Sequence, residues 1–338
     1  MTINRGLDPS ILYSNLVTLA RERMQAFYQS ENRGQKRYDF PFNANIDLEL
    51  KPVLREVFGR KCGYCEVSIS SLEKGFVDRL RPHSGIRDEK EFYPDLYWWL
   101  TFDWYNLIYC CKECFEFKAN YFPIEGKRAL KPTDSLRNER PLLLDPCLDD
   151  PAAHFGYTEE GTVIPFTNKG EQTIGLLRLN RNSLVHGRLL AYQDLDSIIT
   201  RLLSPKPWDK HKSAILYLRK IDRRDKKIEF ASYKQWVLSQ QLEKRPELAK
   251  ILEIEPIRHT KRSVAGVLQQ PENNRSQKIF AYNDFFPIEY IHIQNFKGIT
   301  DLKIDFKENA VQKKSWLFLL GENGVGKSSI LQALAVGI

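Results

Sequence analysis

The chain has 338 residues, and 42% of them are hydrophobic, so it is long enough to form about two or three domains with buried cores. Its 51 Lys and Arg residues outnumber its 43 Asp and Glu residues, and the formal charge of +8 favours a polyanionic partner. No apolar run reaches the ~20 residues of a membrane span, the start lacks a signal-peptide pattern, and six cysteines are too few for a secreted disulfide scaffold. We therefore expect a cytoplasmic protein without a membrane partner.

The first part of the chain predicts helices followed by a small mixed domain. Residues 9–30 carry apolar side chains at helical spacing, and a second short helix is expected at residues 47–59. A strand is expected at residues 76–80 and an aromatic helix at residues 95–107. Aromatic rings can stack on nucleic acid bases, but at helical spacing they are more often core, which we favour here.

The later part predicts a hairpin, a helical region and a second domain. Residues 140–166 have the pattern of a loop and a hairpin, and apolar spacing is helical from about Thr173 to Leu252. A polar, proline-containing linker follows, and then paired strands at 288–306, a buried strand at 315–320 and a helix from 328. The expected domains are 1–150, a zinc domain; 151–254, a hairpin with a basic helical extension; 255–287, a linker; and 288–338, the start of an α/β domain.

Five of the six cysteines lie between Cys62 and Cys114, and four of them form two CxxC pairs separated by 45 residues: Cys62 with Cys65, and Cys111 with Cys114. Two such pairs can close a tetrahedral thiolate shell around zinc, and four protein ligands leave no open position, so this zinc is expected to be structural. The alternatives are free buried cysteines or a redox switch. Cys110 and Cys147 have no matching partner and are interpreted as core thiols.

Several blocks around these cysteines form a recognisable series: "KCGYCE", "VDRLRPHSG", "YWWLTFDWYNLIYCCKECFEFKANYFP", "PLLLDPCLDDP" and "TIGLLRLNRNSLVHGR". In this order they resemble the HNH endonucleases of Septu-type and retron-associated anti-phage systems, over roughly residues 58–188. The resemblance implies a zinc-stabilised ββα-metal fold that cuts nucleic acid phosphodiesters. A divalent ion, Mg or Mn, polarises the phosphate in that family, while a histidine acts as the base and an asparagine orients it.

The carry-over of this motif is mixed. Asp78 stands where the family has its acidic metal ligand, and Asn106 stands at the middle position. Arg79, however, replaces the general-base histidine, and a guanidinium cannot accept a proton at neutral pH. Phe115 replaces the Asn or His that assists the metal. Two of the signature positions have therefore changed.

Replacements for the lost groups lie nearby in the sequence. His83, four residues beyond Arg79, is the remaining candidate for the base, and Glu116 or Asn120 is the candidate for the missing metal group. The alternative is that His83 is an ordinary loop histidine and the site is degenerate. Retained nuclease chemistry and a decayed site both stay open, because a base must lie within hydrogen-bond reach of its proton.

The region between Arg201 and Lys227 holds ten Lys or Arg residues against three Asp residues, a net charge of +7. Beside a nuclease-like domain, such a stretch can bind nucleic acid, with DNA as the expected partner, by neutralising phosphates. The alternative is a solvated helix face.

A phosphate-binding pattern lies near residue 325. Gly321, Gly326, Lys327 and Ser328 fit GxxxxGK[ST] between an expected strand and an expected helix, which is the context that the motif requires. Backbone N–H groups would hold the phosphates of ATP, Lys327 would reach the β and γ phosphates, and Ser328 would bind magnesium.

The segment before this loop adds a second resemblance. "IEYIHIQNFKGITDLKIDF" followed by "GENGVGKSSILQAL" is similar to the N-terminal lobe of RecF and SMC-like ATPases, which implies that Asn295 and Lys297 approach the nucleotide while Asn323, Gly324 and Ser329 complete the loop. That family also needs a Walker B strand, a signature motif and a dimer partner. We interpret the 338 residues as a fragment or early-stopped version of a longer protein.

The expected fold class is α+β: a zinc-stabilised ββα-metal (HNH) domain with a helical extension, then the truncated N-terminal lobe of a P-loop α/β ATPase. The expected function is a metal-dependent nucleic acid endonuclease controlled by ATP in anti-phage defence, with ATPase or reverse-transcriptase subunits as partners. The alternative is a non-catalytic nucleic-acid-binding module attached to such an ATPase.

Overall fold

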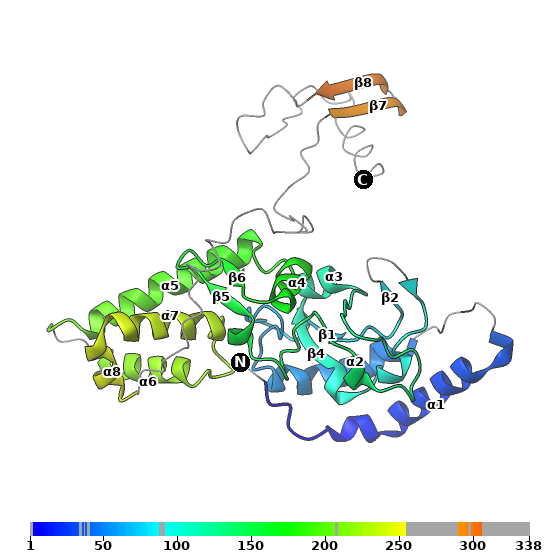
Figure 1. Ribbon diagram of the computed structural model, residues 1–338, viewed down its shortest axis with the longest axis horizontal. Coiled ribbons are helices and arrows are strands. Elements are labelled where there is room, and N and C mark those ends of the chain that lie inside the picture. The colour runs from blue at the N-terminus through cyan, green and yellow to red at the C-terminus, as the bar shows by residue number, and fades with distance from the viewer. Residues whose placement is uncertain are drawn as a thin grey trace. The chain divides into compact units, whose positions relative to one another are not determined.

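The computed structural model describes residues 3–33, 36, 38, 41–87, 92–206, 209–254, 290–296 and 299–305. The chain divides into two compact units, Met1–Ile279 and Phe280–Ile338 (Figure 1). None of the described helices is both long and apolar enough to cross a membrane.

The first unit opens with two helices. A 3-10 turn, η1 (Ser10–Tyr13), leads into α1 (Asn15–Gln29), which begins where the Ser14 hydroxyl accepts a hydrogen bond from the Val17 N–H. After η2 (Glu31–Arg33), α2 covers Pro41–Val57. The helix predicted at residues 9–30 is confirmed. The second helix begins six residues earlier than predicted, because a proline at the first helical position needs no N–H partner.

The centre of the first unit is a pair of antiparallel strands followed directly by a helix. β1 (Gly75–Arg79) pairs with β4 (Leu107–Cys111), with Gly75 opposite Cys111, and α3 (Lys112–Lys118) starts at the next residue. In the sequence between β1 and β4, the chain forms a second small antiparallel ribbon, β2 (Ile86–Arg87) with β3 (Phe92–Tyr93). This arrangement brings the second CxxC pair to the end of β4 and the first turn of α3.

The helix predicted at residues 95–107 is wrong. The chain there forms two 3-10 turns, η3 (Trp98–Leu100) and η4 (Trp104–Asn106), and then enters β4. Tyr97 has a left-handed backbone and Asp103 an extended one, and each interrupts helical hydrogen bonding. The prediction that most of these aromatic residues are core is confirmed, because Tyr97 and Trp104 are 0% and 2% exposed. Burial of rings on different sides of the segment overrides its helical spacing.

A hairpin and a helical region complete the first unit. After η5 (Leu136–Asn138) and η6 (Pro151–Ala153), β5 (Phe155–Tyr157) pairs with β6 (Val163–Pro165) as predicted. α7 packs against α5, α6 and α8, and buried leucine, isoleucine and valine side chains fill these contacts. The helices are α4 (Asn168–Leu176), α5 (Asn182–Leu202), α6 (His211–Asp222), α7 (Ala231–Lys244) and α8 (Pro246–Leu252).

In the second unit the structure describes one antiparallel ribbon, β7 (Tyr290–Phe296) with β8 (Ile299–Asp305), in which Tyr290 lies opposite Asp305. It confirms the paired strands predicted at residues 288–306. The predicted linker, the strand at 315–320, the phosphate loop and its helix lie outside the described residues.

Candidate functional site

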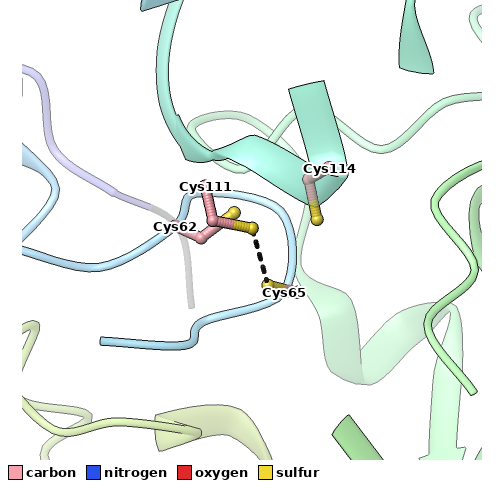
Figure 2. A group of neighbouring side chains, drawn as sticks. All are labelled: Cys62, Cys65, Cys111 and Cys114. Carbon is pink, nitrogen blue, oxygen red and sulfur yellow. Dashed lines mark hydrogen bonds between the residues drawn. The ribbon is translucent and has the colours of Figure 1, made fainter. Parts of the chain in front are cut away.

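The four paired cysteines converge on one point. Their sulfur atoms all lie within 4.8 Å of one another, and the Cys65 and Cys111 Sγ atoms are 3.8 Å apart. Figure 2 shows two of the side chains coming from a loop, and Cys111 and Cys114 from the end of β4 and from α3. The loop is fixed to β4 because the Gly63 N–H donates to the Tyr109 carbonyl at 2.8 Å. The spacing of the two CxxC pairs thus gives one cluster.

The cluster fits a zinc ion. Zinc–sulfur bonds of about 2.3 Å in a tetrahedron place the sulfurs about 3.8 Å apart, which matches the Cys65–Cys111 distance. Hydrogen bonds from the neighbouring thiols lower the pKa of Cys111, whereas burial raises the pKa of Cys62. Within the described part of the chain, no other group of three or more His, Cys, Asp or Glu side chains is close enough to hold one ion.

Asp78, the predicted metal ligand, is buried and fully paired with protein groups. The Tyr64 hydroxyl donates to Oδ2 at 2.6 Å. The Lys118 ammonium, which is 0% exposed, lies 3.3 Å from Oδ1 and 3.1 Å from Oδ2, and it also donates to the Arg79 carbonyl at 2.7 Å. A buried carboxylate must be compensated, and here a lysine on α3 provides the positive charge.

Arg79, at the position of the expected base, has a structural contact of its own. Its guanidinium donates two hydrogen bonds to the Asp47 carboxylate, at 2.7 and 2.6 Å, and one to the Thr101 carbonyl at 3.1 Å. Because Asp47 belongs to α2, this ion pair anchors β1 on that helix. Phe115 stacks on Phe76 with ring centroids 5.1 Å apart. Neither replacement supplies a proton acceptor.

Asn106 holds the loop that leads to His83. Its Oδ1 accepts from the Arg81 N–H at 2.8 Å, and its Nδ2 donates to the Arg81 and Leu100 carbonyls at 3.0 Å each. His83 is half-buried two residues further on, and burial together with the charges of Arg79 and Lys118 lowers its pKa well below the usual value. Both effects favour the neutral form of the imidazole.

The two candidates for the missing metal group make contacts with residues other than Asp78. Glu116 is exposed and its carboxylate is 3.7 Å from the Lys112 ammonium. Asn120 is half-buried, and its backbone carbonyl accepts from the Arg87 N–H at 3.0 Å. Among the described residues, no hydrogen bond or ion pair joins either side chain to Asp78.

Four residues around this site escaped sequence reasoning: Tyr64, Lys118, Asp47 and Arg181. A signal exists for two of them. Tyr64 lies inside the first CxxC pair. Lys118 follows Cys114 by four residues, and this spacing puts the side chains of Cys114 and Lys118 on one face of α3. Asp47 and Arg181 come from distant segments, so only the tertiary structure reveals their contacts.

The basic region has an exposed face on α6. Lys212, Leu216 and Lys220 recur every four residues and are all exposed, with Arg223 just beyond the helix. Three other basic side chains of the region bind within the protein: Arg219 to Glu253, Arg224 to Asp150, and Lys226 to the Glu56 carbonyl. Lys226 is nevertheless exposed, and the other exposed basic residues of the region are Arg201, Lys206, Lys210, Lys212, Lys220, Arg223 and Lys227.

The predicted nucleotide-binding residues are not placed by the structure. Asn295 lies in β7, and nothing is described of its side chain. Lys297 and the loop residues lie outside the described part of the chain: Gly321, Asn323, Gly324, Gly326, Lys327, Ser328 and Ser329.

Comparison with known proteins gives one family match and two similar curated proteins. Residues 287–336 match the AAA ATPase domain family. The chain is 33% identical over 328 residues to Septu protein PtuA of Bacillus mycoides (strain KBAB4), covering 85% of this chain and 45% of that protein. It is 37% identical over 168 residues to Septu protein PtuB of the same strain, covering 46% of this chain and 55% of that protein. The chain spans about half the length of the curated relatives it matches. The predicted ATPase domain and the likeness to Septu proteins are confirmed.

Proposed function

We propose that this chain is a component of a Septu-type anti-phage defence system, in which a zinc-stabilised HNH-like domain binds nucleic acid under the control of an ATP-binding domain. The observation that carries the proposal is the four-cysteine cluster, which joins the loop after α2 to the end of β4 and to α3, beside β1, which pairs with β4. Two strands and a helix held by zinc are what the HNH resemblance implies. The similarity to PtuA and PtuB supports the assignment to a Septu-type system.

Zinc would be held by Cys62, Cys65, Cys111 and Cys114 and would have a structural role. Bound there, it supplies no open coordination position and no catalysis. The four side chains tie the loop after α2 to the end of β4 and the start of α3, so the strand that carries Asp78 depends on this cluster for its position.

A second, catalytic divalent ion does not fit at Asp78 in this arrangement. Both carboxylate oxygens already contact the Lys118 ammonium, and one also accepts from Tyr64. A divalent cation at the same oxygens would be repelled by the buried ammonium. The geometry therefore favours binding without metal-dependent cleavage, and Arg79 and Phe115 at the signature positions agree with that choice.

The exposed face of α6 is the proposed contact for the nucleic acid backbone. Lys212 and Lys220 are eight residues apart, which places them about 12 Å apart along the helix. Basic side chains without a carboxylate partner can each neutralise a phosphate and release a counterion. This contact would recognise the charge of the phosphates, so binding is expected to be independent of the nucleotide sequence.

The proposed role of the second domain is to bind ATP with magnesium. The phosphate loop would supply Gly321, Gly326, Lys327 and Ser328, with Asn323, Gly324 and Ser329 completing it and Asn295 and Lys297 approaching the nucleotide. The match to the AAA ATPase domain supports this assignment. Lys327→Ala is expected to abolish binding of a fluorescent ATP analogue and to leave the zinc content unchanged. An equal affinity in the variant would contradict the assignment.

The second candidate function is an active endonuclease, and one observation favours it. Burial and the charges of Arg79 and Lys118 lower the pKa of His83, which favours the neutral imidazole that can accept a proton, and Asn106 fixes the backbone two residues before it. Cleavage would require Lys118 to move away from Asp78 when nucleic acid binds.

A plasmid assay separates the two functions. The zinc-loaded protein is incubated with supercoiled plasmid and magnesium or manganese, and binding of a labelled duplex is measured on the same preparation. We expect binding without nicking. Nicking that disappears in Asp78→Ala and His83→Ala would establish the endonuclease instead.

The binding contact is tested through its salt dependence. We expect that changing Lys212, Lys220 and Arg223 together to Gln makes the negative slope of log binding constant against log salt concentration shallower by up to about 3. The change should be the same for every duplex sequence. The matched control changes three exposed basic residues elsewhere, Lys127, Lys131 and Arg137, and is expected to keep the original slope. Equal slopes in both variants would remove α6 from the interface.

A further inference from the structure

Arg181 reaches the cysteine cluster from a distant part of the sequence. It is the residue before α5, and its side chain is 10% exposed. Its Nη2 lies 3.7 Å from the Cys65 sulfur, 3.8 Å from the Cys114 sulfur and 4.0 Å from the Cys111 sulfur, and its Nη1 lies 3.9 Å from that of Cys114. One guanidinium thus faces three of the four sulfur atoms.

Other contacts fix the Arg181 side chain in this direction. Nη2 donates to the Glu113 carboxylate at 3.1 Å, and Nη1 donates to the Leu177 and Arg178 carbonyls at 3.2 and 3.4 Å. The Phe117 ring lies 5.7 Å from the guanidinium carbon. The guanidinium is therefore held both by the turn between α4 and α5 and by α3.

We infer that Arg181 is a positioning residue of the zinc centre, which offsets part of its excess negative charge and joins the α4–α5 turn to it. The inference rests on the proposed zinc site. Four thiolates around one divalent ion leave two negative charges in a largely buried place, and burial of uncompensated charge is costly. A planar guanidinium with five donors can face several acceptors at once, which a lysine ammonium does less well.

The position of Arg181 gives the contact a second consequence. The cysteines belong to segments 62–65 and 111–114, whereas Arg181 belongs to the helical extension. Filling the zinc site therefore stabilises the α4–α5 turn, and a well-packed turn stabilises the zinc site, because the two share one contact. Groups just outside a metal's ligands commonly change metal affinity by about 10- to 100-fold.

Zinc transfer to a chromophoric chelator at pH 7.5 tests the inference on the full chain. Arg181→Gln is expected to release zinc at least about tenfold faster than the unaltered protein. The matched control is Arg178→Gln, since Arg178 lies in the same turn and its guanidinium carbon is 4.4 Å from the same Phe117 ring. It is expected to release zinc at the unaltered rate. Arg181→Lys keeps the charge and is expected to fall between.

Three outcomes would overturn the inference. They are equal release rates in Arg181→Gln and the unaltered protein, equal acceleration by Arg178→Gln, and a lysine variant no better than the glutamine variant. If the unaltered protein holds no zinc, the proposed zinc site itself fails, and that result is separate because it is seen before any variant is compared. Hydrogen exchange gives a second readout, since Arg181→Gln should expose amides at the start of α5.

Discussion

At the scale of single residues, the site is defined by how buried charges are paired. Asp78 and Lys118 neutralise each other inside the domain, and Arg79 is neutralised by Asp47. Breaking such a pair on one side leaves a buried charge without compensation, which costs more than removing both members. The residues at the signature positions therefore contribute to stability as well as to any chemistry.

The Asp78–Lys118 pair gives the first prediction. Lys118→Met is expected to lower the free energy of unfolding by about 3 to 5 kcal/mol, because it leaves the Asp78 carboxylate buried. Asp78→Asn together with Lys118→Met is expected to cost at least about 1 kcal/mol less than the two single changes added. Urea unfolding of the four proteins measures this coupling. Strictly additive costs would show that the pair is unimportant.

His83 gives a prediction about pH. Its pKa is lowered in the folded protein by burial and by Arg79 and Lys118, so the unfolded chain binds more protons below about pH 6.5. The unfolding free energy should therefore fall as the pH falls from 7.5 to 5.5, by about 1 kcal/mol more than in His83→Gln. Urea unfolding of zinc-loaded protein at both pH values measures the difference. Parallel losses in the two proteins would contradict it.

At the scale of elements, the end of α2 contacts the helical extension (residues 151–254) just before the first CxxC pair. Gly59 follows the helix with φ +64°, and a Cβ there would lie 2.2 Å from the Lys226 carbonyl oxygen. Lys226 in turn donates from its ammonium to the Glu56 carbonyl at the end of α2. The close approach of the two backbones requires glycine for two reasons, its left-handed conformation and its lack of a side chain.

Gly59→Ala is accordingly expected to destabilise the protein by about 2 to 5 kcal/mol, from left-handed strain and a backbone clash. Gly175 offers the matched control, since it lies in α4 and a Cβ there meets nothing within 4 Å. Gly175→Ala is expected to stabilise by about 0.5 kcal/mol. Thermal unfolding compares them, and similar effects at the two positions would refute the explanation.

At the scale of the whole molecule, the chain combines two compact units of different character. The cysteine cluster lies in Met1–Ile279, and the AAA ATPase match covers residues 287–336 in the other unit. Loss of zinc should therefore lower the stability of the first unit, while nucleotide binding should raise the stability of the second. In the proposed system ATP would control what the first unit does with nucleic acid.

Zinc removal tests this division. Chelation is expected to lower the unfolding midpoint of the first unit by more than about 10 °C, because a structural zinc contributes folding energy, and added zinc should restore it. Cys111→Ser should lose the stoichiometric ion, while Cys147→Ala, whose thiol lies outside the cluster, should keep it. A bound ion that withstands mild oxidant would also exclude the redox-switch reading. An unchanged midpoint would rule out a structural zinc.

The sequence alone was sufficient wherever spacing carries the information. Alternation predicted the β7–β8 ribbon, and apolar spacing predicted α1 and the later helices, because these patterns depend on neighbouring residues. Two CxxC pairs predicted one cluster, because four thiols in two closely spaced pairs are a typical ligand set for one zinc ion. It failed at residues 95–107, where helical spacing was overridden by burial on several sides.

Only the tertiary structure decided what the charged residues do. The sequence identified Asp78, Arg79 and Asn106 as signature positions. It did not reveal that Lys118 neutralises Asp78, that Asp47 holds Arg79, or that Arg181 faces three sulfurs. The physical reason is that a buried charge is defined by its partner, and partners separated by 32 to 116 residues meet only after folding.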